Sequence, residues 1–267
     1  MGAPKQGRLG VDFAGTVEAV GAKVTRFKPG DEVFGSATGS LAEYVVKRQH
    51  ESVVIKPANV TFEQAASVNV AGITALQGLR DFGQLQPGQK VLINGASGGV
   101  GTFAVQIAKS FGAEVTGVCS TRNVELVRSL GADHVIDYAS TDFAESGEQY
   151  DLILDNVANR SMSDLRRVLK PNGRLVIIGG ASGNWIAPFS LPIKAIVMSP
   201  FVDQTLGMMI ARSNQGDMQV LADLMAAGRV TVVIDRRYPL SEAAEAIRYL
   251  ETGRARGKVV VNVEPGV

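Results

Sequence analysis

The residues best suited to chemistry lie in a glycine-rich segment at 94–101, which reads Asn-Gly-Ala-Ser-Gly-Gly-Val-Gly. A short apolar run at 89–94 predicts a buried strand before it, and helical spacing at 100–111 predicts a helix after it. At such a turn, bare amides and the positive helix end can hold a pyrophosphate. Gly98 and Gly101 permit the tight turn and close approach of the phosphates. The segment therefore predicts dinucleotide binding, with an ordinary strand-to-helix turn as the alternative.

A second feature lies about 20 residues further on, where NAD sites place Asp or Glu against the ribose 2′-hydroxyl. This chain has Ser120 there, followed by Arg122. A carboxylate would repel a 2′-phosphate, whereas Ser120 leaves room for it and Arg122 can pair with it. The pattern favours NADPH. The alternatives are a helix N-cap for Ser120 and a solvated side chain for Arg122.

The elements that must position these residues alternate along the chain. Strands are predicted at 89–94, 114–119, 134–136, 152–155 and 173–178, and helices at 100–111, 123–130 and 162–169. Strands that alternate with helices of about ten residues indicate parallel βαβ units. The predicted fold class is therefore α/β, with a doubly wound Rossmann sheet.

Both ends of the chain carry other patterns. Short strands are expected at 10–20, 31–34, 42–46 and 52–56, which makes the front of the chain β-rich. Thr61 can cap a helix with Gln64 at its third position, and helical spacing continues to Leu79. After an irregular stretch at 181–203, helices are expected at 218–227 and 241–251, with extended segments at 230–234 and 258–263.

Composition excludes several kinds of partner. The 267 residues include 27 Lys and Arg against 26 Asp and Glu, and these basic residues form no stripe that could follow phosphates. We therefore expect no nucleic-acid partner. The apolar tract at 185–211 contains three prolines and two charged residues, so no membrane span is expected. Residues 1–10 lack an apolar signal region, which favours a cytoplasmic location.

Residue counts also exclude several kinds of site. One cysteine, Cys119, and two histidines are too few for a Cys/His metal site. His50 and His134 both favour structural roles, in a loop and at a strand start. No tyrosine has a lysine four residues later, which excludes the short-chain dehydrogenase pair. A methyltransferase would need an acid near Ser120 for the ribose hydroxyls.

Several motifs together resemble the medium-chain dehydrogenase/reductase superfamily. The motifs that resemble the superfamily as a whole are the segments 10–21, 29–33 and 71–75. Within the superfamily, the chain resembles the zinc-free quinone oxidoreductase branch, especially reticulon-interacting reductase-like proteins, in the segments 94–106, 130–133, 153–157 and 254–258. The resemblance implies a GroES-like catalytic domain from residues 1–70 and 204–267, around a Rossmann NADP-binding domain at 71–203. It also implies that the front of the GroES-like domain is missing, and that the protein is a homodimer.

The resemblance also bears on metal. Zinc-dependent relatives place a histidine after the glycine that corresponds to Gly10, and a cysteine before the Ala-Gly at 71–72. This chain has Val11 and Val70 at those positions, and neither side chain can bind zinc. We therefore expect no metal.

The resemblance further assigns residues to the cofactor. Those around the pyrophosphate are Ser97, Gly98, Gly99, Val100 and, in the same turn, Gly101. Those around the 2′-phosphate are Ser120, Arg122 and Tyr138, and those lining the ribose and nicotinamide are Asn159, Ile178, Gly179, Ser199, Phe201 and Arg256. Tyr44 lies in a segment that resembles the cleft-lining loop, but no catalytic residue is assigned.

The expected activity is NADPH-dependent hydride transfer, without zinc, to a quinone or an α,β-unsaturated carbonyl. Charge that develops on oxygen in these acceptors is delocalised, so a proton from water can complete the reduction. Two alternatives stay open at this point. One is an NADPH-binding interaction protein without catalysis, and the other is a zinc-free carbonyl reductase resembling alcohol dehydrogenases.

Overall fold

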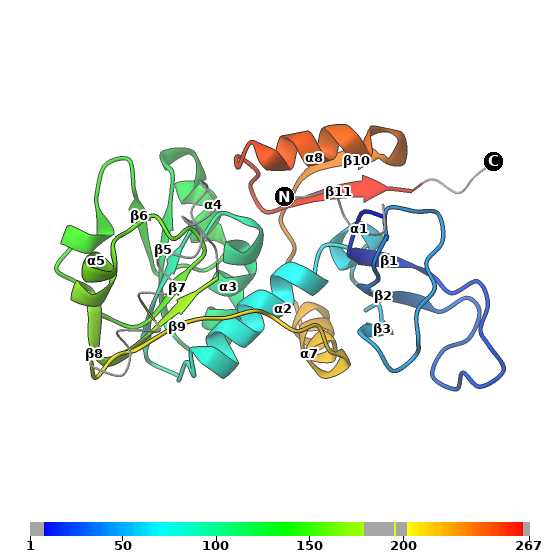
Figure 1. Ribbon diagram of the computed structural model, residues 1–267, viewed down its shortest axis with the longest axis horizontal. Helices are drawn as coiled ribbons and strands as arrows, with labels where there is room; N and C mark the ends of the chain where they lie inside the picture. Colours follow the sequence, from blue (N-terminus) through cyan, green and yellow to red (C-terminus); the bar gives the residue numbers. More distant parts are fainter. Residues whose placement is uncertain (1–7, 179–194, 196–201, 264–267) are drawn as a thin grey trace. The chain divides into compact units, whose positions relative to one another are not determined.

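The computed structural model describes residues 8–178, 195 and 202–263 (Figure 1). The chain divides into two compact units, each with its own core. The first unit combines Met1–Ile73 with Arg212–Val267, and the second is Thr74–Ala211. The division after residue 73 falls within helix α2 (Asn69–Gln77).

The second unit is built on one parallel sheet. Its strands are β4 (Lys90–Asn94), β5 (Glu114–Cys119), β6 (His134–Asp137), β7 (Tyr150–Asp155), β8 (Leu169–Ile177) and β9 (Thr205–Met208). They pair in the order β6-β5-β4-β7-β8-β9. All of these pairs are parallel, so the predicted α/β Rossmann class is confirmed. The order reverses beside β4, and ligands of such sheets bind at the carboxyl ends of the strands near this point.

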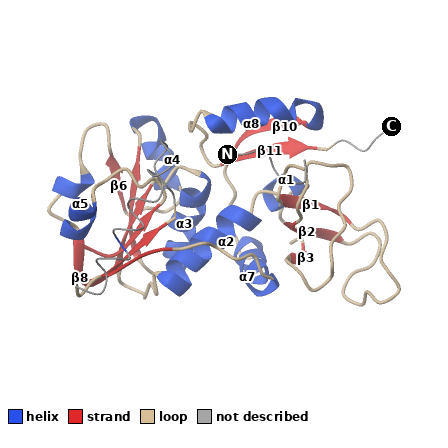
Figure 2. Ribbon diagram, in the orientation of Figure 1, coloured by secondary structure: helices blue, strands red, loops and turns tan. Residues whose placement is uncertain are grey.

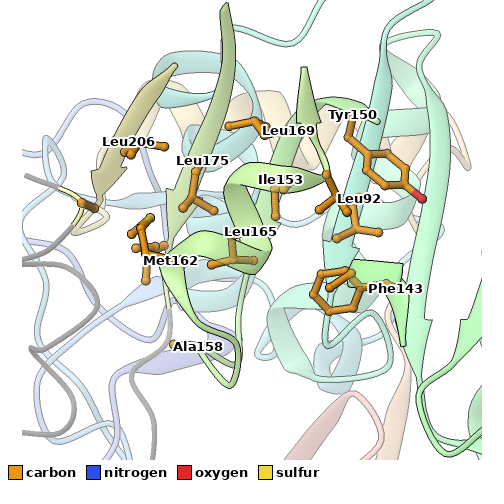
Figure 3. Close-up of a cluster of buried hydrophobic side chains, with 14 of the residues drawn as sticks. Leu92, Phe143, Tyr150, Ile153, Ala158, Met162, Leu165, Leu169, Leu175 and Leu206 are labelled. Carbon is orange, nitrogen blue, oxygen red and sulfur yellow. The ribbon is translucent and has the colours of Figure 1, made fainter. Parts of the chain in front are cut away.

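Helices cover both faces of this sheet. They are η1 (Gly78–Phe82), α3 (Gly99–Ser110), η2 (Thr121–Asn123), α4 (Val124–Ser129), η3 (Phe143–Glu145) and α5 (Met162–Arg167). A row of buried side chains crosses four adjacent strands in register: Leu92, Ile153, Leu175 and Leu206. Leu165 of α5 belongs to the same cluster (Figure 3). Because side chains alternate between faces, a Cβ added to Gly117 would face the other way and meet Val127 of α4.

The first unit is β-rich. An antiparallel sheet contains β1 (Asp12–Thr16), β2 (Glu32–Ser36) and β3 (Val53–Ile55), and a parallel pair joins β10 (Ile234–Pro239) to β11 (Lys258–Asn262) (Figure 2). The helices are α1 (Phe62–Ala65), α7 (Gln215–Ala226), η5 (Leu240–Glu242) and α8 (Ala243–Glu251). The predicted capping box is confirmed at α1. Thr61 Oγ1 accepts from Gln64 N–H at 3.2 Å, and Gln64 Oε1 accepts from Thr61 N–H at 3.0 Å.

Two expectations about local structure are wrong. No strand forms at 42–46, where Tyr44 and Val46 are 72% and 99% exposed. Their β-forming residue types do not produce a strand there, because residues 42–46 have no partner in the described sheets. The helix expected from Thr61 to Leu79 is interrupted at residues 66–68.

Asp133 ties helix α3 to strand β5. Its carboxylate accepts from Lys109 Nζ at 2.8 Å and from Val115 N–H at 2.7 Å. Burial raises the pKa of Asp133, but the hydrogen bonds from Lys109 and Val115 and the positive charge of Lys109 lower it, and the pKa lies below its ordinary value. A depressed pKa means that the ionised carboxylate stabilises the folded state. This stabilisation is present above the unfolded pKa and is lost as pH falls through the folded pKa.

We therefore expect Asp133→Asn to lower the melting temperature at pH 7. The difference from the wild type should shrink as pH falls below about 4, where the unfolded carboxyl takes up a proton while the folded carboxyl is still ionised. Thermal unfolding between pH 3 and pH 8 measures this. Glu125→Gln is the matched control, because its ion pair with Arg128 is exposed and contributes little. A loss for Asp133→Asn that is the same at every pH would contradict the prediction.

Candidate functional site

The glycine turn lies at the carboxyl end of β4, where the sheet order reverses. Gly95 has a φ of 78°, and the amides of Gly95 and Ala96 both donate to Val118 O, at 3.1 and 2.9 Å. Helix α3 then begins at Gly99, and its N-cap Gly98 makes no side-chain capping bond. The first amides of α3 precede its first intrahelical bond, so they can bind an anion.

Two glycines of this turn lie in different surroundings. A Cβ on Gly101 would lie 2.1 Å from Gly95 O and 2.7 Å from Ala96 C, so the helix packs on its own turn without space for a side chain. A Cβ on Gly98 would meet nothing closer than Gly95 O, at 3.4 Å. Gly101 therefore serves internal packing, whereas a Cβ at Gly98 would meet no described atom other than Gly95 O within 4 Å.

One buried amide joins this turn to the end of β5. Asn123 Nδ2 donates to Ser97 Oγ at 2.9 Å and to Ser120 Oγ at 3.1 Å. Asn123 is only 5% exposed, whereas both serines are partly exposed. The structure thus brings together Ser97 and Ser120, which the sequence assigned to the two ends of one nucleotide. Asn123 itself was missed, because an asparagine at the start of a helix has the ordinary interpretation of a cap.

Both signs of charge occur where β5 and β6 end. Arg122 is exposed on the η2 turn, and Tyr138 is 56% exposed, with its amide donating to Cys119 O at 3.0 Å. Asp137, the last residue of β6, lies opposite Cys119 in the register of the two strands. Hydrogen bonds from the Thr121 side chain and the Ala139 amide hold the pKa of Asp137 below its ordinary value, so it stays ionised.

A network of polar side chains closes the carboxyl end of β7. Asp155 is fully buried, and its Oδ1 accepts from Asn94 Nδ2 at 2.9 Å, Ala158 N–H at 2.9 Å and Val157 N–H at 3.1 Å. Asn94 Nδ2 also donates to Asn159 Oδ1 at 3.1 Å. The predicted residue Asn159 is therefore connected to β4 and β7. Ala158 has a φ of 55°, which is unusual for alanine and shows how tightly this loop is held.

The remaining predicted residues lie in several places. Ile178 follows β8, is partly exposed, and donates its amide to Asp155 O at 2.9 Å. Gly179, Ser199 and Phe201 lie outside the described residues. Arg256 belongs to the first unit, where its amide donates to Asp235 Oδ2 at 3.0 Å and its Nε lies 3.7 Å from Asp235 Oδ1.

The positions discussed for metal carry apolar side chains. Val11 and Val70 are 51% and 47% exposed, and the Val70 amide donates to Asp12 at 3.1 Å. Within the described part of the chain, no group of three or more His, Cys, Asp or Glu side chains is arranged to hold an ion. Burial raises the pKa of Cys119 to about 11, so its thiol is protonated at neutral pH. Among the helices described, none is long and apolar enough to cross a membrane.

The residues at this site fit a dinucleotide. Gly98 leaves open space at the start of α3, and two partly exposed hydroxyls lie on either side of a buried amide. The Asn123 Oδ1 atom is buried without a hydrogen-bond partner among the described residues. A polar, pre-shaped surface of this kind at the switch point suits a phosphorylated ligand.

The fold and this turn define a Rossmann-type α/β protein joined to a β-rich unit. Residues 2–120 match the family described as alcohol dehydrogenase GroES-like domain, and residues 130–261 match the family described as zinc-binding dehydrogenase. The chain belongs to the medium-chain dehydrogenase/reductase superfamily, in the quinone oxidoreductase branch. The predicted family is confirmed. The missing front of the GroES-like domain stays a prediction.

The chain is similar to known proteins both in sequence and in structure. The mitochondrial NAD(P)H oxidoreductase RTN4IP1 of Bos taurus is 37% identical, over 96% of this chain and 70% of its own length. The chloroplast envelope quinone oxidoreductase homolog of Arabidopsis thaliana is 36% identical, over 94% and 78%. The quinone oxidoreductase from Coxiella burnetii has a TM-score of 0.83 at 31% identity, over 96% and 79%. These names include two organelles, and a cytoplasmic location for this chain stays a prediction.

Proposed function

We propose that this chain is an NADPH-dependent oxidoreductase that transfers hydride, without zinc, to a quinone or an α,β-unsaturated carbonyl. The names of its relatives, which include quinone oxidoreductases and NAD(P)H oxidoreductases, support the reaction class. The observation that carries the choice of nucleotide is Ser120 at the end of β5. It stands, linked to the glycine turn through Asn123, where an NAD site would have a carboxylate.

Each part of the site has a separate role in this proposal. The first amides of α3 and Ser97 bind the pyrophosphate, and Ser120 with Arg122 binds the 2′-phosphate. The Asp155 network fixes the loop that carries Asn159 beside the ribose. When bound, NADPH would supply the hydride. The chain contributes mainly binding and orientation, since no described group is assigned as a catalytic acid.

The acceptor class follows from Val11 and Val70, whose side chains cannot supply zinc ligands at the two positions discussed above. A simple ketone develops a localised alkoxide that needs a Lewis acid or proton donor nearby. Quinones and enones delocalise the charge, and a proton from water completes their reduction. Electron-poor conjugated acceptors therefore suit the chain better than simple ketones.

A turnover assay tests the proposal. Purified chain is mixed with NADPH and, separately, with phenanthrenequinone, an enone and a simple ketone, after NADPH binding has been shown by fluorescence titration. We expect oxidation of NADPH with the quinone or the enone, unchanged by a chelator. Binding without turnover for any acceptor would favour a non-catalytic interaction protein. Turnover of the ketone alone would favour a carbonyl reductase.

The nucleotide preference has its own test in Ser120→Asp. The new carboxylate would lie beside the 2′-phosphate, so we expect NADPH affinity to fall by about tenfold or more while NADH affinity is kept or improved. Titrations with both nucleotides measure the change. Ser129→Asp adds the same charge at the opposite end of α4 and is the control. A wild type that prefers NADH, or an unchanged preference in Ser120→Asp, would refute the role of Ser120.

A further inference from the structure

The Asn123 side chain connects two parts of the site that come from different elements. Ser97 lies in the turn between β4 and α3, and Ser120 follows β5. A single amide nitrogen, Asn123 Nδ2, lies 2.9 Å from Ser97 Oγ and 3.1 Å from Ser120 Oγ. An amide nitrogen carries two protons, so each serine oxygen can receive one of them. The spacing between the two hydroxyls is therefore fixed by one buried side chain.

The direction of these hydrogen bonds decides what the serines can do. Because each serine oxygen accepts from Asn123, neither hydroxyl proton is used on the amide. Each proton is left to point away from Asn123, and both serines are partly exposed. A hydroxyl that accepts one bond and donates another is also polarised toward donation. Both serines are thus set as donors, which is the role that phosphate oxygens require.

The amide oxygen of Asn123 indicates that the residue has a role other than stability alone. Asn123 Oδ1 is buried, and it has no hydrogen-bond partner among the described residues. A buried carbonyl oxygen without a partner opposes folding. An apolar side chain of similar size would avoid this cost. Asparagine at 123 is therefore better explained by what its nitrogen does for the two serines.

We propose that Asn123 is a positioning residue that fixes Ser97 and Ser120 as paired hydrogen-bond donors for a nucleotide phosphorylated at both the 5′ and the 2′ positions. The inference rests on the proposed function, because it needs the nucleotide at this site. It adds that one buried amide couples recognition of the pyrophosphate to recognition of the 2′-phosphate.

Two fragments of the nucleotide can distinguish the role of Ser97 from the role of Ser120. The probe 5′-ADP carries the pyrophosphate without a 2′-phosphate, and 2′,5′-ADP carries a phosphate at the 2′ position. Calorimetric titration of both is carried out on the wild type, Asn123→Leu, Asn123→Ala, Ser97→Ala and Ser120→Ala. Asn59→Ala is the matched control, because Asn59 Nδ2 also donates to two oxygens, Met225 O and Ala226 O, in the first unit.

We expect Ser97→Ala to weaken the binding of 5′-ADP, and Ser120→Ala to weaken the binding of 2′,5′-ADP selectively. Both Asn123 variants should bind each probe about tenfold more weakly than the wild type. Adding Asn123→Ala to the Ser97→Ala, Ser120→Ala double variant should cause no further loss, because Asn123 acts only through these hydroxyls. Without ligand, the variants should melt well above the temperature of the titration, so that unfolding does not account for the lost affinity. Asn59→Ala should bind both probes as the wild type does.

Two results would overturn the inference. Wild-type affinity of the Asn123 variants for both probes would show that the serines need no positioning, and additive losses with the serine variants would show that Asn123 acts by another route. Both results leave the proposed function intact. A wild type that binds neither the probes nor NADPH would instead refute the proposed function, and the inference with it.

Discussion

Gly101→Ala is expected to destabilise the second unit severely. The new Cβ would lie 2.1 Å from Gly95 O and 2.7 Å from both Ala96 C and Ala96 Cα, and all three are backbone atoms that no rotamer change can move. Helix α3 must shift away from the sheet, where its neighbours Phe103 and Ala104 are buried. We expect a loss of about 3 kcal/mol in the free energy of unfolding, as for strong overpacking of a core. Urea denaturation measures it.

Gly98→Ala is the control within the same turn. Its φ of −82° and ψ of 178° suit alanine, and its Cβ would meet only Gly95 O at 3.4 Å. Stability should therefore stay within about 1 kcal/mol of the wild type. Affinity for NADPH should nevertheless fall, because the methyl group would occupy the space that the phosphates need in the proposed site. Equal stability of the two variants would contradict the separate roles of these glycines.

Asp155→Ala is expected to cause the second large loss. Removing the carboxylate leaves three donors without their acceptor: Asn94 Nδ2, Val157 N–H and Ala158 N–H. Asn94 and Ala158 are buried, so water cannot readily replace Asp155. We expect a destabilisation of about 3 kcal/mol, seen in chemical denaturation.

Asp155→Asn separates hydrogen bonding from charge. The carboxamide oxygen can still accept at the Oδ1 position, and its nitrogen would replace Oδ2, which has no partner among the described residues. Stability should therefore remain within about 1 kcal/mol of the wild type. If Asp155→Asn were as unstable as Asp155→Ala, the negative charge and not the acceptor would be the important property.

Sequence reasoning succeeded where local signals determine the structure. Strand β5 begins and ends at the predicted residues 114 and 119, because a short buried run between a glycine turn and a helix start has few alternatives. The capping box at Thr61 is equally local. Segment 42–46 failed because a strand needs a neighbour, and residue types alone do not supply one. Strand β9, at Thr205–Met208, was missed because four residues carry little strand signal of their own. The strand forms because it pairs with β8.

The candidate site was predictable to the same extent. The glycine turn and the end of β5 carry spacing that a single sequence reveals. The contact between the glycine turn and the end of β5 is not visible in the sequence. Asn123 and Ser97 are 26 residues apart, and only the parallel pairing of β4 with β5 brings these two residues together. The Asp155 network likewise joins residues 61 and 65 positions apart. Asparagine and aspartate at strand ends are common, and their partners depend on the sheet order.

The split first unit has a consequence for how the chain folds as it is synthesised. Residues 74–211 are continuous, so the Rossmann unit can fold as soon as it has left the ribosome. The front of the chain must wait, because Val53 O of β3 accepts from Gln215 across 162 residues and Glu63 pairs with Arg237 across 174. At about 5–20 residues per second, strands β1 to β3 wait roughly 10 to 40 s for these partners. We therefore expect residues 8–60 to be the part most exposed to aggregation during synthesis, for a time set by the rate of translation.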